Sequence, residues 1–402
     1  MHGPAEDSRG APEAATGTWP ASLGTVLREW GRIGVTGFGG PPAHIALLRR
    51  LCVEDRGWLD AAEFEDAIAA CNLLPGPAST ELAIFCAWRV RGRPGAVVGG
   101  LAFIVPGLII ILALSALFLA GTPPLWVRGA GAGAGAAVAA VAVQAGWSLL
   151  TPSWKRASAR EPVRISRLRW ALYLLAGGAA SATIGPWLVL ALLGCGVVEV
   201  SLRRVPWRPS AVPGIAPLFP AALTGGLLAA VAWTAFKVGA LSFGGGFVII
   251  PLMRADAVGH GWMTSAQFLN AVALGQITPG PVVQTVSAVG YAAAGLPGGL
   301  LAAVVAFSPS FAFVLGGGRY FSALRTNRAA QSFLDGAGPA AIGAIFGAAV
   351  LLARALSVGW QFAVLAGAAV LLLALRRGVV LTLLSAAAVG LVIAFAGGPL
   401  PQ

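Results

Sequence analysis

The sequence predicts an all-α integral membrane protein made of two inverted-topology repeats, with broken or re-entrant helices and about ten membrane crossings. Three observations support this fold class: an apolar composition, an internal repeat and the distribution of basic loops. Of the 402 residues, 57% are hydrophobic and 10% are charged, whereas soluble domains carry about 25% charged residues. Apolar runs at 96–120, 129–150 and 379–396 reach the roughly 20 residues that a helix needs to cross a bilayer. Because these runs do not alternate polar and apolar residues, they argue against a β-barrel.

An internal repeat is the second observation. Phe38-Gly39-Gly40 recurs as Phe243-Gly244-Gly245, and Pro75-Gly76-Pro77 recurs as Pro279-Gly280-Pro281. Matched residues stay roughly 204 positions apart, which indicates a duplication of about half the chain. A duplicated apolar chain with Gly and Pro breaks at corresponding positions is typical of secondary transporters.

Four segments follow from the repeat. Residues 1–21 are rich in Gly, Pro and Ala and lack the apolar core of a signal peptide, so they are predicted to be a disordered tail. Residues 22–202 form the first repeat, and residues 218–400 form the second, inverted one. Residues 203–217 between them, rich in Arg and Pro, are predicted to be a linker.

Both repeats contain the same predicted elements in the same order. A helix ends at the Phe-Gly-Gly break, and a short second segment follows it. Next comes a pair of pieces of about 13 residues hinged on Pro-Gly-Pro, each about 20 Å long as a helix and so too short to span. Each pair is therefore predicted to be a re-entrant hairpin, followed by four longer apolar helices. The first helices cover 22–37 and 218–241, and the hairpins cover 62–74 with 78–90 and 265–277 with 282–294.

The basic residues supply the third observation. In the first half they gather at 89–93, 154–169 and 203–208, whereas in the second half they gather in the turns at 319–328 and 376–377. Loops that are equivalent in the two halves thus differ in charge, and the positive-inside rule puts them on opposite sides of the membrane. The net charge of +12, from 27 Lys and Arg against 15 Asp and Glu, is explained by this orientation signal and not by nucleic-acid binding.

The sequence indicates no enzyme. It contains no paired acids and no nucleophile–base set, and its cysteines and histidines lack the spacing of a metal or redox site. We therefore predict no cofactor and no metal. The cysteines are Cys52, Cys71, Cys86 and Cys195, and the histidines are His2, His44 and His260.

The paired breaks are the predicted substrate site. Non-helical backbone inside a bilayer is tolerated where it is buried in protein or lines a wet cavity, and free N–H groups at a helix start bind anions. A kink that only bends the helix is the alternative for one motif, but two motifs repeated in register favour a binding site. The backbone, hydroxyl and amide candidates are Phe38, Gly39, Gly40, Gly76, Ser79, Thr80, Phe243, Gly244, Gly245, Gly280, Gln284 and Thr285.

Charged residues near the breaks add further candidates. Arg32 and Lys237 occupy the same repeat position, which suits an anionic substrate, with snorkelling toward a headgroup as the alternative. Glu81 either takes a proton or pairs with Arg32, and His44 is a second candidate for proton coupling. Asn72 and Gln276 precede the two Pro-Gly-Pro motifs at equivalent positions, where they would cap freed backbone groups.

The motifs resemble those of the chromate ion transporter family, in its long two-half form. GFGGPPAHI at 37–45, GWL at 57–59 and LLPGPASTE at 73–81 are similar to its first half, and LSFGGG at 241–246 and GQITPGP at 275–281 to its second. The resemblance implies a multi-pass antiporter of the cell inner membrane that exports chromate, driven by the proton-motive force. Sulfate or another oxyanion, and an anion channel, are the alternatives. The expected partners are chromate or sulfate, protons and the lipid bilayer, without nucleic acid, and a homodimer is one assembly left open. The first half departs from the family pattern at one step: it reads Pro106-Gly107, where the second half has the family's Pro-Ser as Pro309-Ser310.

Overall fold

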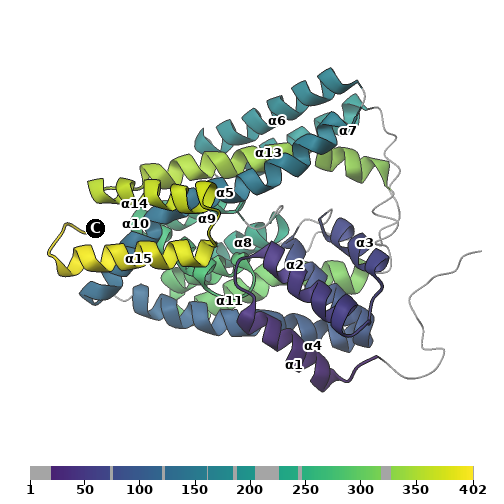
Figure 1. The fold of residues 1–402 in the computed structure, drawn as a ribbon, viewed down its shortest axis with the longest axis horizontal. Coiled ribbons are helices and arrows are strands. Elements are labelled where there is room, and N and C mark those ends of the chain that lie inside the picture. The colour runs from purple at the N-terminus through teal and green to yellow at the C-terminus, as the bar shows by residue number, and fades with distance from the viewer. Residues whose placement is uncertain are drawn as a thin grey trace, which may run out of the picture.

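The computed structural model describes residues 20–72, 76–119, 123–160, 162–183, 188–203, 226–242, 247–317 and 327–401 (Figure 1). Its regular elements are all helical, as the sequence predicts. The first half contains α1 (Leu23–Thr36), α2 (Pro41–Arg49), η1 (Arg50–Asp55), α3 (Ala61–Cys71), α4 (Ala78–Phe118), α5 (Leu125–Ser158), α6 (Val163–Thr183) and α7 (Leu188–Leu202). The second half contains α8 (Leu227–Ala240), α9 (Ile250–Gly259), α10 (Ser265–Ile277), η3 (Val282–Gln284), α11 (Thr285–Gly317), α13 (Arg328–Arg354), α14 (Gly359–Ala369), η5 (Val370–Ala374) and α15 (Val379–Phe395).

Side-chain caps mark the starts of α1 and α10. The Ser22 hydroxyl accepts a hydrogen bond from the Thr25 amide at 3.1 Å, at the start of α1. Thr264 and Gln267 form a reciprocal capping box at the start of α10, which runs over the predicted range 265–277. The predicted tail up to residue 19, the linker from residue 204 and the Phe243-Gly244-Gly245 break lie outside the described residues.

Two long helices share a kink at equivalent positions of the two halves. In α4, Arg91 has φ −145° and ψ 22°, and Gly92 has φ 63° and ψ −157°. In α11, Ala294 has φ −144° and ψ 27°, and Gly295 has φ 63° and ψ −154°. Positive φ favours glycine, which explains why each half carries one there. The sequence repeat is therefore also a repeat of backbone conformation. Through this kink the second piece of each predicted hairpin joins the long helix that follows.

The last helices of each half pack on the other half. α6 and α7 contact α13, and α14 and α15 contact α5. Figure 1 shows α6 and α7 along α13 at the top, and α14 and α15 beside α5 at the left. The long helices α4 and α11 also contact each other, as do α5 and α13. Each half thus packs its last two helices against the other half, so the two halves are not separate domains.

Glycines allow these helices to approach closely. A Cβ placed on Gly343 of α13 would lie 1.8 Å from the Leu174 carbonyl oxygen of α6. One placed on Gly133 of α5 would lie 2.1 Å from the Ala386 carbonyl oxygen of α15. Backbone-to-backbone contact through small residues is characteristic of helix packing in membranes, where lipid supplies no hydrophobic drive between helices.

The described helices include four that are long and apolar enough to cross a bilayer. They cover Ala78–Phe118, Leu125–Ser158, Val282–Gly317 and Arg328–Arg354. Large apolar side chains remain exposed on the outside of the bundle, as lipid contact requires; Ile109 is 63% and Val304 is 69% exposed. The number of about ten crossings stays a prediction.

Candidate functional site

The end of α1 meets the second Pro-Gly-Pro turn. The Gly280 amide donates a hydrogen bond to the Gly37 carbonyl at 3.0 Å. The same carbonyl lies 2.9 Å from His44 Nε2 on α2. Because a carbonyl oxygen only accepts, this contact assigns the proton to Nε2. The other ring nitrogen, Nδ1, lies 3.2 Å from the Ser79 hydroxyl at the start of α4. His44, fully buried, therefore links the first break, the first turn and the second turn.

The first Pro-Gly-Pro turn places a carboxylate in the interior. Glu81 is fully buried, and neither of its oxygens has a hydrogen-bond partner among the described residues. Its carboxylate lies against Gly76, because a Cβ on Gly76 would be 2.1 Å from Oε1. The same Cβ position is 3.6 Å from the Ser310 hydroxyl of α11. The first turn therefore faces a helix of the second half.

The second turn has the reciprocal environment. Gln284 Nε2 donates to the Ile104 carbonyl of α4 at 2.7 Å. A Cβ on Gly107 of α4 would be 2.1 Å from the Pro279 carbonyl oxygen and 2.4 Å from Gln284 Oε1. The second turn therefore packs on the Pro106-Gly107 step, at the position equivalent to Pro309-Ser310. Because the Pro279 backbone leaves no space for a side chain at position 107, the first copy has glycine where the second copy has the serine of Pro-Ser, and the reason is steric.

Unpartnered buried polar groups gather at these two turns. We call Thr80, Glu81, Gln276, Gln284 and Ser310 the turn polar cluster. Among the described residues no hydrogen-bond partner is found for Thr80 Oγ1, both Glu81 oxygens, Gln276 Nε2, Gln284 Oε1 and Ser310 Oγ. Buried polar groups are nearly always paired, so such a concentration from both halves makes the two turns the candidate site for a polar ligand.

The glycines of the breaks have conformations that side chains rarely adopt. Gly39, Gly40 and Gly280 have φ of 102°, 74° and 95°. Gly40 is close to the second turn, because a Cβ on it would be 3.7 Å from Val282 Cγ2. Phe38 is 45% exposed. The predicted residues of the first break and the second turn thus lie together.

The two predicted cations each hold a carboxylate. Lys237 Nζ is 2.5 Å from Asp256 Oδ2, which also accepts from the Thr234 hydroxyl at 2.8 Å. Arg32 is 3.1 Å from Glu29, and its side chain is 62% exposed. In both halves an ion pair involves the first helix, but the buried carboxylate lies on α9 in one half and on α1 in the other. The i, i+3 spacing of Glu29 and Arg32 signals this pair in the sequence, whereas Asp256 carries no such signal.

The remaining candidates lie beside the turns. Thr285 Oγ1, at the start of α11, donates to the Val282 carbonyl of η3 at 2.8 Å. Gln276 is 7% exposed near the end of α10. Asn72 follows α3 with an exposed side chain, and its backbone amide donates to the Ile68 carbonyl at 3.0 Å. Sequence reasoning missed Ser310, although it noted the Pro-Ser step that contains it.

A bundle of long apolar helices with buried polar groups at its helix breaks is typical of membrane transporters. The Chromate transporter family model matches residues 24–200 and 229–391, so the chain belongs to this family and is a multi-pass membrane transporter, not an enzyme. The family resemblance of its motifs is thereby confirmed.

Full-length relatives agree with this assignment. The chain is 32% identical over 344 residues to a probable chromate transport protein of Synechococcus elongatus, covering 83% of this chain and 85% of the relative. It is 32% identical over 354 residues to the chromate transport protein of Cupriavidus metallidurans, covering 85% of each. It is 29% identical over 350 residues to that of Pseudomonas aeruginosa, covering 83% of this chain and 82% of the relative. No solved structure matches the chain.

Proposed function

We propose that this protein moves tetrahedral oxyanions, chromate first and sulfate as the alternative, across the cell inner membrane, coupled to the proton-motive force. The names of its relatives support chromate. The observation that carries the proposal is the turn polar cluster, in which both halves bring buried and unpartnered polar groups to the two Pro-Gly-Pro turns.

A dianion at this place would be held by several donors at once. Removing an ion from water costs several kcal/mol unless charges or hydrogen bonds compensate it. The starts of α4 and η3 supply free backbone N–H groups, which favour anions. Thr80, Ser310 and the Gln276 amide add side-chain donors. Lys237 and Arg32 contribute less, because each is already paired with a carboxylate.

Glu81 is the proposed proton acceptor. An ionised carboxylate against Gly76 would repel an oxyanion at the first turn, whereas a protonated one donates a hydrogen bond to it. The protein would therefore bind the anion in the state in which Glu81 carries its proton. His44 is the second candidate, through its contacts with Gly37 and Ser79.

Replacing Glu81 with glutamine tests this coupling. Sulfate is the better probe, because it stays a dianion from mildly alkaline to mildly acidic buffer. Wild-type binding, measured by calorimetry on purified protein, should strengthen as pH falls, whereas Glu81→Gln should bind at one affinity throughout. Its flux in vesicles should no longer respond to a proton gradient. Glu65→Gln on α3, at an exposed ion pair, is the control. Unchanged pH dependence in Glu81→Gln would remove Glu81 from the coupling, and proton-independent wild-type flux would indicate a channel.

The inverted arrangement of the two halves is part of the proposal. It is supported by the matched kinks, by the exchanged packing of α6–α7 and α14–α15, and by the basic loops. Arg164→Cys in the first turn of α6 and Ser357→Cys just before α14 introduce exposed thiols at the starts of corresponding helices. All four native cysteines are buried. An impermeant maleimide should label these two variants from opposite sides of the membrane. Labelling from one side refutes the inversion.

A further inference from the structure

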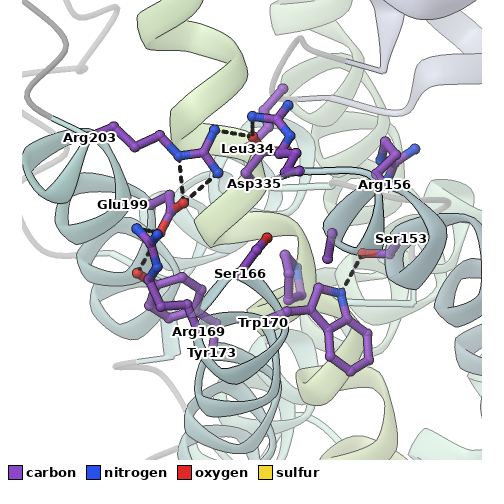
Figure 2. Close-up of a pocket in the computed structure, with 13 residues that line it drawn as sticks. Ser153, Arg156, Ser166, Arg169, Trp170, Tyr173, Glu199, Arg203, Leu334 and Asp335 are labelled. Carbon is purple, nitrogen blue, oxygen red and sulfur yellow. Dashed lines mark hydrogen bonds and ion pairs between the residues drawn. The ribbon is translucent and has the colours of Figure 1, made fainter. Parts of the chain in front are cut away.

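A basic cavity lies where the end of α5, the start of α6, the end of α7 and the first turns of α13 meet (Figure 2). Its space is about 360 Å³, with the open mouth included. None of its lining residues belongs to the turn polar cluster or to the broken segments. Four arginines, Arg156, Arg160, Arg169 and Arg203, line it together with two carboxylates, Glu199 and Asp335. The lining therefore carries a surplus of two positive charges.

Three of the arginines already hold the two carboxylates. Arg203 is 2.5 Å from Glu199 and 3.0 Å from Asp335. Arg160 is 2.6 Å from Asp335, and Arg169 is 3.3 Å from Glu199. Each carboxylate thus has two guanidinium partners, and the described residues that line the cavity leave no acidic side chain for a further cation.

Two donor groups remain for a ligand. Arg156 forms no ion pair or hydrogen bond with any described residue, although it lines the cavity. Arg169 Nε is buried and likewise lacks a hydrogen-bond partner. Figure 2 shows Arg169 and Arg156 on opposite sides, with the Ser166 hydroxyl between them. Guanidinium groups on two sides of a hydroxyl suit a group with several acceptor oxygens, such as a phosphate.

The surroundings place the cavity at the membrane surface. Trp154 is 37% exposed and packs edge-on against Trp170, with ring centroids 4.9 Å apart. Arg167 lies over the Trp154 ring at 5.3 Å, and Trp147, two turns earlier on α5, is 61% exposed. Tryptophans gather at headgroup level, and clustered basic residues beside them attract anionic lipids.

We propose that this cavity binds a phosphate group, either in the headgroup of an anionic phospholipid or as free phosphate. The bound oxyanion would pair with Arg156 and Arg169 and neutralise the surplus charge. Because the ion pair between Arg203 and Asp335 joins the end of α7 in the first half to α13 in the second, the ligand would also stabilise the contact between halves. The inference does not depend on the transported anion.

The test uses the full chain in detergent, with thermal unfolding and lipid binding as readouts. Mixed micelles containing phosphatidylglycerol should raise the unfolding temperature of the wild type, whereas phosphatidylcholine should not. Arg156→Ala breaks no ion pair, so it should fold normally and bind phosphatidylglycerol about tenfold more weakly. Arg164→Ala, at an exposed arginine in the first turn of α6 outside the cavity lining, is the matched control and should behave as wild type.

The outcomes distinguish a phospholipid headgroup from free phosphate as the ligand. Stabilisation by phosphatidylglycerol but not by inorganic phosphate identifies a lipid site, and stabilisation by inorganic phosphate alone, lost in Arg156→Ala, identifies a free-phosphate site. Equal weakening in Arg156→Ala and Arg164→Ala would mean diffuse surface charge and would overturn the site. So would the absence of any response to both ligands.

Discussion

A Gly280→Val protein should fold and yet bind neither chromate nor sulfate measurably. Gly280 has φ 95°, a conformation in which a β-branched residue is strongly disfavoured. Valine would rotate the peptide and withdraw the amide that bonds the Gly37 carbonyl, at the point where the first break meets the second turn. A left-handed non-glycine residue costs about 1–2 kcal/mol, which a multi-helix protein can lose without unfolding. Isothermal titration of monodisperse protein measures the loss.

A second glycine provides the matched control. Gly261 has φ 69°, lies in the turn between α9 and α10, and has no atom near its Cβ position. Gly261→Val should therefore lower the unfolding temperature in the same way but leave anion affinity unchanged. If Gly280→Val also binds normally, the second turn is a structural kink and the anion binds elsewhere.

The first turn should respond comparably. A side chain on Gly76 would collide with the Glu81 carboxylate, 2.1 Å from the Cβ position. Gly76→Val should thus displace Glu81 and abolish binding as well, because both turns face the same cluster. Loss of anion binding in only one of the two variants would show that the turn of the other variant has a structural role alone.

The repeat made much of the fold predictable. Gly and Pro at matched positions marked the breaks, and the 13-residue spacing gave α10 its observed ends. The sequence also drew attention to Gly107 as a departure from the Pro-Ser step. It could not show why, because the group that excludes a side chain is the Pro279 carbonyl, which lies far along the chain in the other half. Contacts between halves depend on tertiary packing that local patterns do not encode.

Charges illustrate the same limit. The basic stretch 154–169 was interpretable as a topology signal, but not as a cavity wall, since Arg203 and Asp335 reach it from α7 and α13. Arg32 and Lys237 were recognised as equivalent cations. The carboxylates that pair with these two cations lie at different positions in the two halves. The repeat therefore predicted the two cations but could not predict Asp256 as a partner.

Lys237→Ala should therefore lose folded protein, and not only transport. Asp256 is 7% exposed, and without the ammonium group the Thr234 hydroxyl is the one side-chain partner left for its charge in the part of the chain that the structure describes. Breaking a buried ion pair from one side costs about 3–5 kcal/mol. Arg32→Ala should cost about 0–1 kcal/mol, because Arg32 is exposed and Glu29 keeps Arg56 at 3.0 Å. Unfolding temperatures and the yield of monodisperse protein measure the difference, and equal stability of the two variants would contradict the buried-pair interpretation.

Exchanging the two charges then separates stability from substrate binding. The double variant Lys237→Asp with Asp256→Lys keeps an ion pair between α8 and α9 and should regain most of the stability lost in Lys237→Ala. Its oxyanion flux in vesicles decides the role of the cation. If the anion needs a positive charge on α8, the swapped protein is stable and inactive, and Lys237 belongs to the binding site. If flux returns with stability, the pair only ties α8 to α9, and the anion depends on the two turns alone.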